Sequence, residues 1–241
     1  MDRPHPPETN DLLTLTGFDL SLEDLGRAAF DSETPVFLAS SAKEAILRSR
    51  TFIEDLLDTS DQIYGVTTGF GRLAEVVIPE NQRGDLQTNL IRSHAAGIGR
   101  TLSRPEVRAI MILRANALAR GHSGCRLEVV ERLLAYLNQG IHPQVPEFGS
   151  VGASGDLAPL AHVALTLLGE GEAEFRGSVQ SMKEVLPQVG LQGMQLREKE
   201  GLALINGTQA TTGLGILSFL RAEAALEVAE VAGAMSLEGV K

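Results

Sequence analysis

The chain has 241 residues, 43% of them hydrophobic, which is enough to build one sizeable domain or two small ones around a buried core. Its net charge of -10 and the absence of a basic stripe argue against nucleic acid as a partner. A single cysteine, Cys125, excludes an internal disulfide and a thiolate metal cage. No apolar stretch approaches the ~20 residues of a membrane helix, and "MDRPHPPETN" lacks the order of a signal peptide. We therefore expect a cytoplasmic protein with no membrane partner.

The first half of the chain carries one strand signal and two helix signals. "TPVFLA", near residue 35, is typical of a short strand. Ser41 with Glu44 three residues later predicts a reciprocal cap at the start of a helix over about 42–58. Ser103 with Glu106 predicts the same device before a helix that starts near 104.

The second half adds three further elements. "RLEVVERLLAYLNQG" has helical spacing of Leu and Val and predicts a helix that stops at Gly140. "EAEFRGSVQ", residues 172–180, predicts a hairpin that turns at Arg176 and Gly177. Residues 208–241 predict one long helix with acidic residues on one side, still patterned where the sequence stops, so we expect the chain to be cut off there. These elements predict a mainly α fold with small β elements.

The segment "GSVGASGDLAPLAH", residues 149–162, sets Ser154 among small residues just before an apolar helix pattern. A hydrolase nucleophile elbow needs Gly-x-Ser-x-Gly, but Asp156 stands where the second glycine belongs. A Walker loop ends in Gly-Lys-Ser/Thr and a dinucleotide fingerprint follows a strand, and neither condition is met. One interpretation that remains is structural: a glycine-rich turn with Asp156 as helix N-cap, Pro159 in the first turn and Gly169 at the end.

The other remaining interpretation is chemical. If the chain bends so that the nitrogen of Gly155 reaches the carbonyl carbon of Ala153, cyclisation with loss of water makes a five-membered ring, and Gly155 has no Cβ to obstruct it. Dehydration of Ser154 then leaves an exocyclic methylene. Such a ring is an electrophile made from the protein itself, and nearby helix N-termini would stabilise negative charge that develops on it.

Three more segments accompany this one in a familiar order: "YGVTTGFG" at 64–71, "LQTNLIRSHAAGIG" at 86–99 and "KEGLALINGTQ" at 199–209. With them the chain, from about Leu15 onward, resembles the aromatic amino acid ammonia-lyase family, and the histidine ammonia-lyases most. The family's proteins are substantially longer. The resemblance implies the helical ammonia-lyase fold, with 1–241 as a single N-terminal domain that carries the active-site segment and a central long-helix bundle truncated at the C-terminus.

The family uses a 4-methylidene-imidazol-5-one (MIO) group, formed autocatalytically, with no metal and no PLP. The catalytic residues that the resemblance implies are Tyr64, Ala153, Ser154, Gly155, Asp156 and Asn206. Tyr64 would be the base, Asn206 would lie beside the ring and hold the substrate's amino acid end, and Asp156 would assist ring formation. Structural alternatives are a half-buried tyrosine, a turn asparagine before Gly207 and the helix cap.

The resemblance assigns substrate contacts to His94, Gly71 and Leu157. His94 matches the position where histidine ammonia-lyases face the substrate's imidazole, whereas phenylalanine-selective relatives have an apolar residue there. An imidazole can exchange a hydrogen bond with His94, but a phenyl ring would leave it unpaired. Tyrosine aminomutases can carry a similar Ser-His pair, and Thr67 departs from the Y-G-x-N-T-G of histidine ammonia-lyases. A lone histidine on a helix can also be purely structural.

The expected activity is therefore elimination of ammonia from an aromatic L-amino acid, with L-histidine to trans-urocanate favoured. Phenylalanine or tyrosine ammonia-lyase and tyrosine 2,3-aminomutase remain alternatives. The histidines and Cys125 have no paired metal-ligand spacing, and none of the lysines stands in a setting that resembles a PLP site. The family also implies a homotetramer, or here a complementing C-terminal segment. A catalytically incomplete fragment that acts as a subunit-binding module is the alternative from another class.

Overall fold

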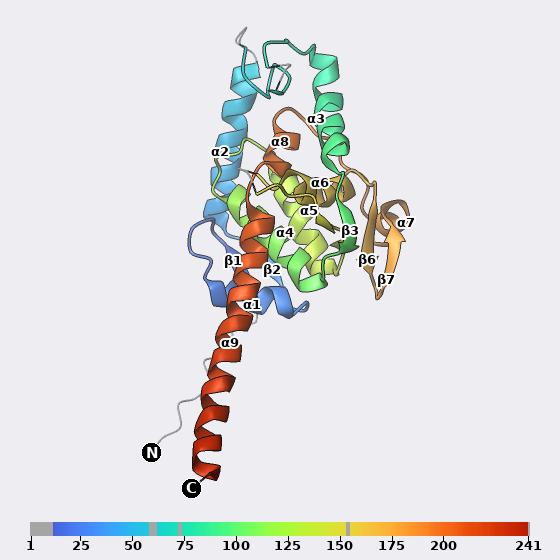
Figure 1. Cartoon of the computed structure of the whole chain (residues 1–241). Helices are drawn as coiled ribbons and strands as arrows, with labels where there is room; N and C mark the ends of the chain where they lie inside the picture. Colours follow the sequence, from blue (N-terminus) through green and yellow to red (C-terminus); the bar gives the residue numbers. More distant parts are fainter. Residues whose placement is uncertain (1–11, 58–61, 72–73, 153–154, 241) are drawn as a thin grey trace.

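Helix α4, Arg104–Ala119, runs through the centre of the molecule, whose structure is a computed structural model that describes residues 12–57, 62–71, 74–152 and 155–240 (Figure 1). Nearly every residue from Val107 to Ala119 is buried, because this segment is apolar on all sides. It packs against α1 (Leu22–Phe30), α5 (Leu127–Gln139) and α9 (Gln209–Gly239). Arg108 is fully buried in α4 and donates to the carbonyls of Ala28 (3.0 Å) and Leu137 (3.1 Å).

Helices form most of the described chain, which confirms the predicted fold class. They are α1 (Leu22–Phe30), α2 (Ser40–Leu57), α3 (Glu80–His94), α4, α5 (Leu127–Gln139), α6 (Leu157–Leu167), α7 (Met182–Gln188), α8 (Glu200–Ile205) and α9 (Gln209–Gly239).

The strands are short and form three small sheets at the edge of the helical body. They are β1 (Leu13–Leu15), β2 (Val36–Leu38), β3 (Ile98–Thr101), β4 (His142–Pro143), β5 (Pro146–Phe148), β6 (Glu172–Phe175) and β7 (Ser178–Ser181). β1 pairs with β2 in parallel, β3 with β5 antiparallel, and β4, β6 and β7 form an antiparallel sheet. Figure 1 shows the β6–β7 hairpin and α7 on the opposite side of the body from α2.

Several local predictions are confirmed. Ser103 and Glu106 form the capping box of α4, and the Ser103 amide donates to the Glu106 carboxylate at 2.7 Å. α5 ends at Gly140 in the left-handed conformation. The hairpin turns at Arg176 and Gly177, both with positive φ, as a tight two-residue hairpin turn requires.

The predicted cap of α2 is wrong. The helix begins at Ser40, and the Lys43 amide already donates to the carbonyl of Ala39 at 3.0 Å. Ser41 therefore lies inside the first turn, where it cannot occupy the flanking N-cap position that the Ser41–Glu44 pattern predicted.

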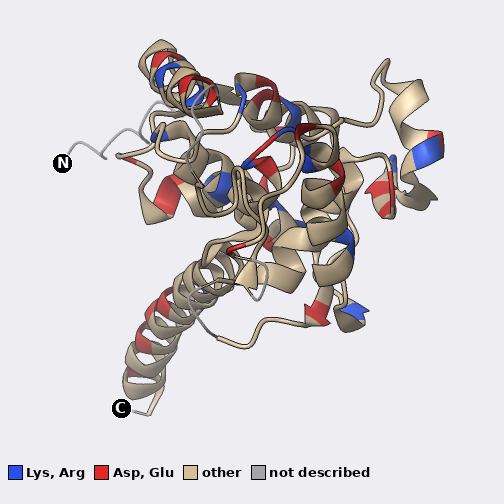
Figure 2. Ribbon diagram, turned by 90° about the horizontal axis from the view of Figure 1, so that it is seen from above, with Lys and Arg blue, Asp and Glu red and all other residues tan. Residues whose placement is uncertain are grey.

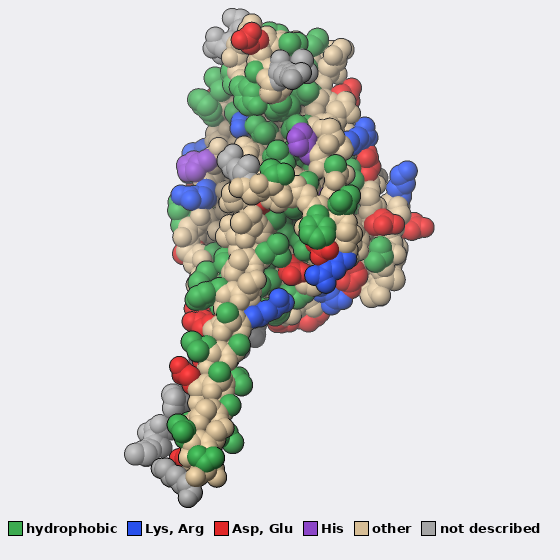
Figure 3. Space-filling view, in the orientation of Figure 1, with side chains coloured by type: hydrophobic (Ala, Val, Ile, Leu, Met, Phe, Trp, Pro, Cys, Tyr) green, Lys and Arg blue, Asp and Glu red, His purple; other side chains and the backbone are tan. Residues whose placement is uncertain are grey.

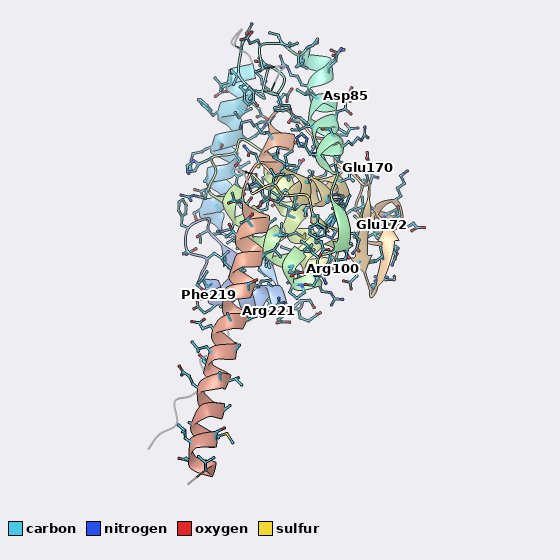
Figure 4. All side chains as sticks on the ribbon, viewed as in Figure 1. Asp85, Arg100, Glu170, Glu172, Phe219 and Arg221 are labelled. Carbon is cyan, nitrogen blue, oxygen red and sulfur yellow. The ribbon has the colours of Figure 1, made fainter. Side chains whose placement is uncertain are left out.

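Helix α9 leaves the body and projects beyond it (Figure 1). Its buried residues are Ala210, Gly213 and Leu217, all in the first third of the helix. Arg221 lies over the ring of Phe30 on α1, 5.4 Å from its centroid. Figure 4 shows Phe219 and Arg221 at the edge of the body. Among the described residues, no helix is both long and apolar enough to cross a membrane.

Candidate active site

Three helix ends meet around the segment that follows residues 153 and 154. Ala153 and Ser154 lie outside the described residues, and Gly155 is the first described residue after them. α6 begins and α8 ends here, α9 begins three residues after the end cap of α8, and α3 packs against both α6 and α8. The predicted residues Gly155, Asp156, Leu157 and Asn206 are thus brought together from segments about 50 residues apart.

Gly155 and Asn206 are in close contact. A Cβ at position 155 would lie 2.8 Å from the Asn206 side-chain oxygen and 3.5 Å from Cδ2 of Leu157. Only glycine fits without displacing these neighbours, and its missing side chain leaves the amide of Asn206 directly beside the backbone. This cradle fits the ring that the resemblance implies, because Gly155 would supply a ring nitrogen with Asn206 next to it.

Asp156 occupies the N-cap position of α6, as the structural interpretation predicts, but its carboxylate does not cap α6. It instead accepts hydrogen bonds from the amide and hydroxyl of Thr211, both at 2.7 Å, and from the hydroxyl of Ser150 at 2.7 Å. The amide of Thr211 is one of the free donors in the first turn of α9. The side chain of Asp156 therefore caps α9, and that part of the prediction is wrong.

The Asp156 carboxylate is fully buried, and within the described residues it has no ion pair. Three donors from neutral groups and the N-terminus of α9 replace water around it, which is what a buried charge requires. The Asp156 amide also donates to the carbonyl of Gly207 at 2.6 Å. This residue thus joins the start of α6, the turn after α8 and the first turn of α9.

A buried cation lies beneath the same turn. Arg114 of α4 is 4% exposed, and its Nη1 donates to the carbonyl of Asn206 (3.2 Å) and to the side chain of Gln209 (2.8 Å). Its Nε has no hydrogen-bond partner among the described residues. Burial lowers the pKa of Arg114 to about 10, so the side chain stays charged at neutral pH and adds positive potential beneath Asn206.

His94 is the last residue of α3. Its Nδ1 lies 2.8 Å from the carbonyl of Leu90, which can only accept, so Nδ1 carries the proton. In the neutral tautomer that this bond selects, the other ring nitrogen, Nε2, is an acceptor. The chain after His94 turns back at Gly97, whose amide donates to Nε2 of His162 on α6 at 3.1 Å. Burial lowers the pKa of His162, which keeps its ring neutral and able to accept.

Tyr64 lies on the segment between α2 and α3 and is 53% exposed. Its ring makes an edge contact with Phe70, and its hydroxyl accepts a long hydrogen bond of 3.4 Å from the amide of Gly71. A Cβ at neighbouring Gly65 would lie 3.3 Å from Leu202 of α8, so this segment packs against the helix that ends at Asn206. Within the described residues, the Tyr64 hydroxyl has no hydrogen bond to any other predicted site residue.

Thr67, the departure from the histidine ammonia-lyase pattern, has a local structural task. Its hydroxyl accepts from the amide of Ile63 at 2.8 Å, while its own amide and that of Val66 donate to the Ile63 carbonyl. These bonds close the turn that carries Tyr64. Thr67 thus shapes the segment and is 4% exposed.

Distant contacts hold α8, and with it Asn206, in place. Glu200 is fully buried and receives a bidentate pair from Arg126, at 2.8 and 2.9 Å, plus the amide of Arg197 at 2.8 Å. The amide of Gly201 donates to the side chain of Gln87 on α3 at 2.9 Å. A six-residue helix is too short to be stable alone, so these bonds position it.

The sequence interpretation gave no role to four residues that contact this site: Ser150, Thr211, Arg114 and His162. Ser150 and His162 stand within the quoted segment 149–162. A hydroxyl group near glycines, as at Ser150, gives no signal of its carboxylate partner. Arg114 could have been found as a charged residue inside an apolar helix pattern, which is rarely buried without a purpose. Among the described residues, no group of three or more His, Cys, Asp or Glu side chains could hold a metal ion.

Known proteins match this sequence and this arrangement. The family model for aromatic amino acid lyases matches residues 20–241. The histidine ammonia-lyase of Geobacillus thermodenitrificans is 48% identical over 229 residues, which are 95% of this chain and 45% of that protein. The crystal structure of histidine ammonia-lyase from Trypanosoma cruzi superposes with a TM-score of 0.88 at 37% identity, over 94% of this chain and 44% of that one.

A tyrosine aminomutase from Streptomyces globisporus also has this fold, with a TM-score of 0.79 and 42% identity over 85% of this chain and 38% of its own. The chain thus spans less than half the length of these relatives, and the part that it spans contains the three helix ends around Gly155. Since the match extends over almost the whole chain in sequence and in structure, the chain belongs to the aromatic amino acid lyase family.

Proposed function

We propose that this chain provides the ring-bearing part of an ammonia-lyase that removes ammonia from an aromatic L-amino acid, L-histidine above all. The observation that carries the proposal is the cradle at Gly155, where a side chain would overlap Asn206. The Ala153-Ser154-Gly155 ring, once formed, supplies an electrophile for the substrate's amino group. No metal or PLP is part of the proposal.

The chain's own residues would divide the remaining work. The side-chain amide of Asn206, whose main-chain carbonyl accepts from Arg114, would bind the amino acid end of the substrate. Tyr64, whose side chain is half-exposed on a segment packed against α8, would remove the β-proton once its hydroxyl and the substrate come together. Leu157, packed beside Gly155, and Gly71, beside the Tyr64 hydroxyl, would contact the substrate.

His94 supports the choice of substrate. Because Nδ1 is occupied by the Leu90 carbonyl, Nε2 offers a lone pair. An imidazole N–H or a phenol O–H can donate to it, but a phenyl ring cannot, and an acceptor that a bound substrate covers without pairing costs about 1–3 kcal/mol. The 48% identity to a histidine ammonia-lyase favours the imidazole.

A second candidate is a tyrosine aminomutase, which is favoured by the same acceptor on His94 and by a solved relative at 42% identity. Both candidates need the ring. They differ in the fate of the ammonia, which a lyase releases and a mutase returns to the β-carbon.

The experiment is an intact-mass measurement of the purified chain together with product analysis. Ring formation should remove the mass of two waters, and incubation with L-histidine should yield urocanate and ammonia. L-phenylalanine should react at least about tenfold more slowly than L-histidine because it leaves His94 unpaired. β-Tyrosine from L-tyrosine would identify the mutase instead. A folded chain of unmodified mass with no product would support the alternative of a silent subunit-binding fragment.

A further inference from the structure

The two ends of the segment that contains residues 153 and 154 are tied to each other. Ser150 lies before the segment and Asp156 directly after Gly155, and the Ser150 hydroxyl donates to Oδ1 of Asp156 at 2.7 Å. Thr211 of α9 donates to the same oxygen through its hydroxyl and to Oδ2 through its amide. The carboxylate therefore lies at the junction of three bonds, which join Ser150 to Asp156 and fasten Asp156 to α9.

We propose that Ser150 and Thr211 are positioning residues for the formation of the ring: they hold the Asp156 carboxylate and draw the ends of the loop together, so that the residues between them are bent for cyclisation. The inference rests on the proposed function, since it concerns the same ring. It assigns a task to two residues that contact neither Asn206 nor Gly155 through a hydrogen bond.

Ring formation needs such a constraint. The nitrogen of Gly155 must form a bond to the carbonyl carbon of Ala153, although an open chain rarely bends that tightly. The first water that is lost consists of the carbonyl oxygen of Ala153 and the amide protons of Ser154 and Gly155. The second takes the Ser154 hydroxyl with its Cα proton. No oxidant or reductant enters, so the protein has to supply only geometry and proton transfer.

Both hydroxyl groups come from exposed residues, whereas the carboxylate that they bind is fully buried. Removal of either hydroxyl therefore changes the loop without opening a cavity in the core. The backbone amide of Thr211 stays in every variant, which leaves one bond to Asp156 and keeps the first turn of α9 capped.

The test follows the loss of two waters over time. The full 241-residue chain and its variants are made by cell-free synthesis, and intact mass is recorded at intervals. Thr211→Val, Ser150→Ala and the double variant should form the ring at least about tenfold more slowly, because each loses a hydrogen bond to a charged group. Thr211→Ser should restore the rate. Thr212→Val is the same change one residue later. Because the Thr212 side chain makes no hydrogen bond to Asp156 within the described residues, this variant should form the ring at the rate of the parent.

The outcomes separate the two proposals. Circular dichroism and thermal unfolding verify that each variant is folded. If the folded double variant loses two waters as fast as the parent, the positioning role is overturned while the proposed function stands. If the folded parent never loses two waters, the proposed function is wrong, and this inference, which depends on it, is wrong as well. A slow Ser150→Ala variant would support the role even where Thr211→Val proved unstable, because it acts on the other side of the carboxylate.

Discussion

Buried charges in this protein are held largely by neutral partners. Arg108 donates to main-chain carbonyls, Arg114 to a carbonyl and an amide side chain, and Asp156 accepts from two hydroxyls and an amide. A buried charge costs several kcal/mol unless such bonds replace its water shell, so each of these residues fixes the segments that supply its partners. Among the described residues, the exceptions are Glu200, which is paired with Arg126, and Arg50, which is paired with Glu54 and Glu198. At the site, this places a fixed positive charge under Asn206 and a fixed negative charge beside Gly155.

His142 gives a pH dependence that can be measured. It is 4% exposed, and burial, followed by the nearby Arg108 and Arg104, lowers its pKa from 6.5 to about 4. As the pH falls, His142 binds a proton in the unfolded chain before it does so in the folded one. Its contribution to the free energy of unfolding is therefore complete above about pH 6.5 and is lost as the pH drops toward 4. Between pH 7 and pH 5 the loss from His142 should be about 2 kcal/mol.

Urea unfolding of the parent and of His142→Gln at both pH values tests this. The variant should lose about 2 kcal/mol less than the parent on going from pH 7 to pH 5, whatever its stability at pH 7. An equal loss in both proteins would contradict the assignment.

At the scale of elements, local signals located the helices whose ends are capped by their own residues. α4 begins at a capping box and α5 ends at a left-handed glycine, and both are readable from the sequence. α8 carries no such signal: it is six residues long, starts after Lys199 with a φ of 74° and depends on Arg126 and Gln87. The helix that presents Asn206 is therefore set by distant contacts.

Two glycines at helix ends provide a matched pair. Gly121 follows α4 with a φ of 69°, and a Cβ there would lie 2.5 Å from the carbonyl group of Ala45 in α2; Gly140 has a φ of 68° and no neighbour within 4 Å of that point. Gly140→Ala should cost about 1 kcal/mol from backbone strain alone. Gly121→Ala adds the clash with a backbone atom and should cost about 3 kcal/mol. Chemical denaturation of both variants measures these two costs. Equal losses of free energy of unfolding would contradict the prediction and show that α2 moves away from position 121 without cost.

At the scale of the whole molecule, the projecting part of α9 is the largest feature without a covering layer. Every residue from Arg221 to Val240 is exposed, including Leu226 and Val231, each 61% exposed (Figure 3). Acidic residues also lie along this helix (Figure 2), and Glu223, Glu227 and Glu230 are spaced to share one side, as the sequence predicted. Apolar side chains at this density on an exposed helix are typical of an interface.

We expect copies of this chain to associate through α9, as the homotetramer implied by the family resemblance would require. Light scattering after size-exclusion chromatography should give an oligomer for the parent. Leu226→Glu combined with Val231→Glu should give a monomer, because the charges would have to be buried unpaired. Glu230→Gln, which changes charge but not apolar surface, should stay oligomeric. A monomeric parent would contradict this prediction.

The sequence by itself determined the family, the mainly α fold, the hairpin and the helix ends with local caps, because these depend on neighbours within a few residues. It also indicated Gly155, Asp156 and Asn206 as a group, through motifs whose spacing carries the resemblance. Only the tertiary structure decided that Asp156 caps α9 and not its own helix, that Arg114 lies under Asn206, and that Ser150 and Thr211 share one carboxylate. The physical reason is that a buried charge takes its partners from whichever segments the packed core brings to it, and local sequence does not specify those segments.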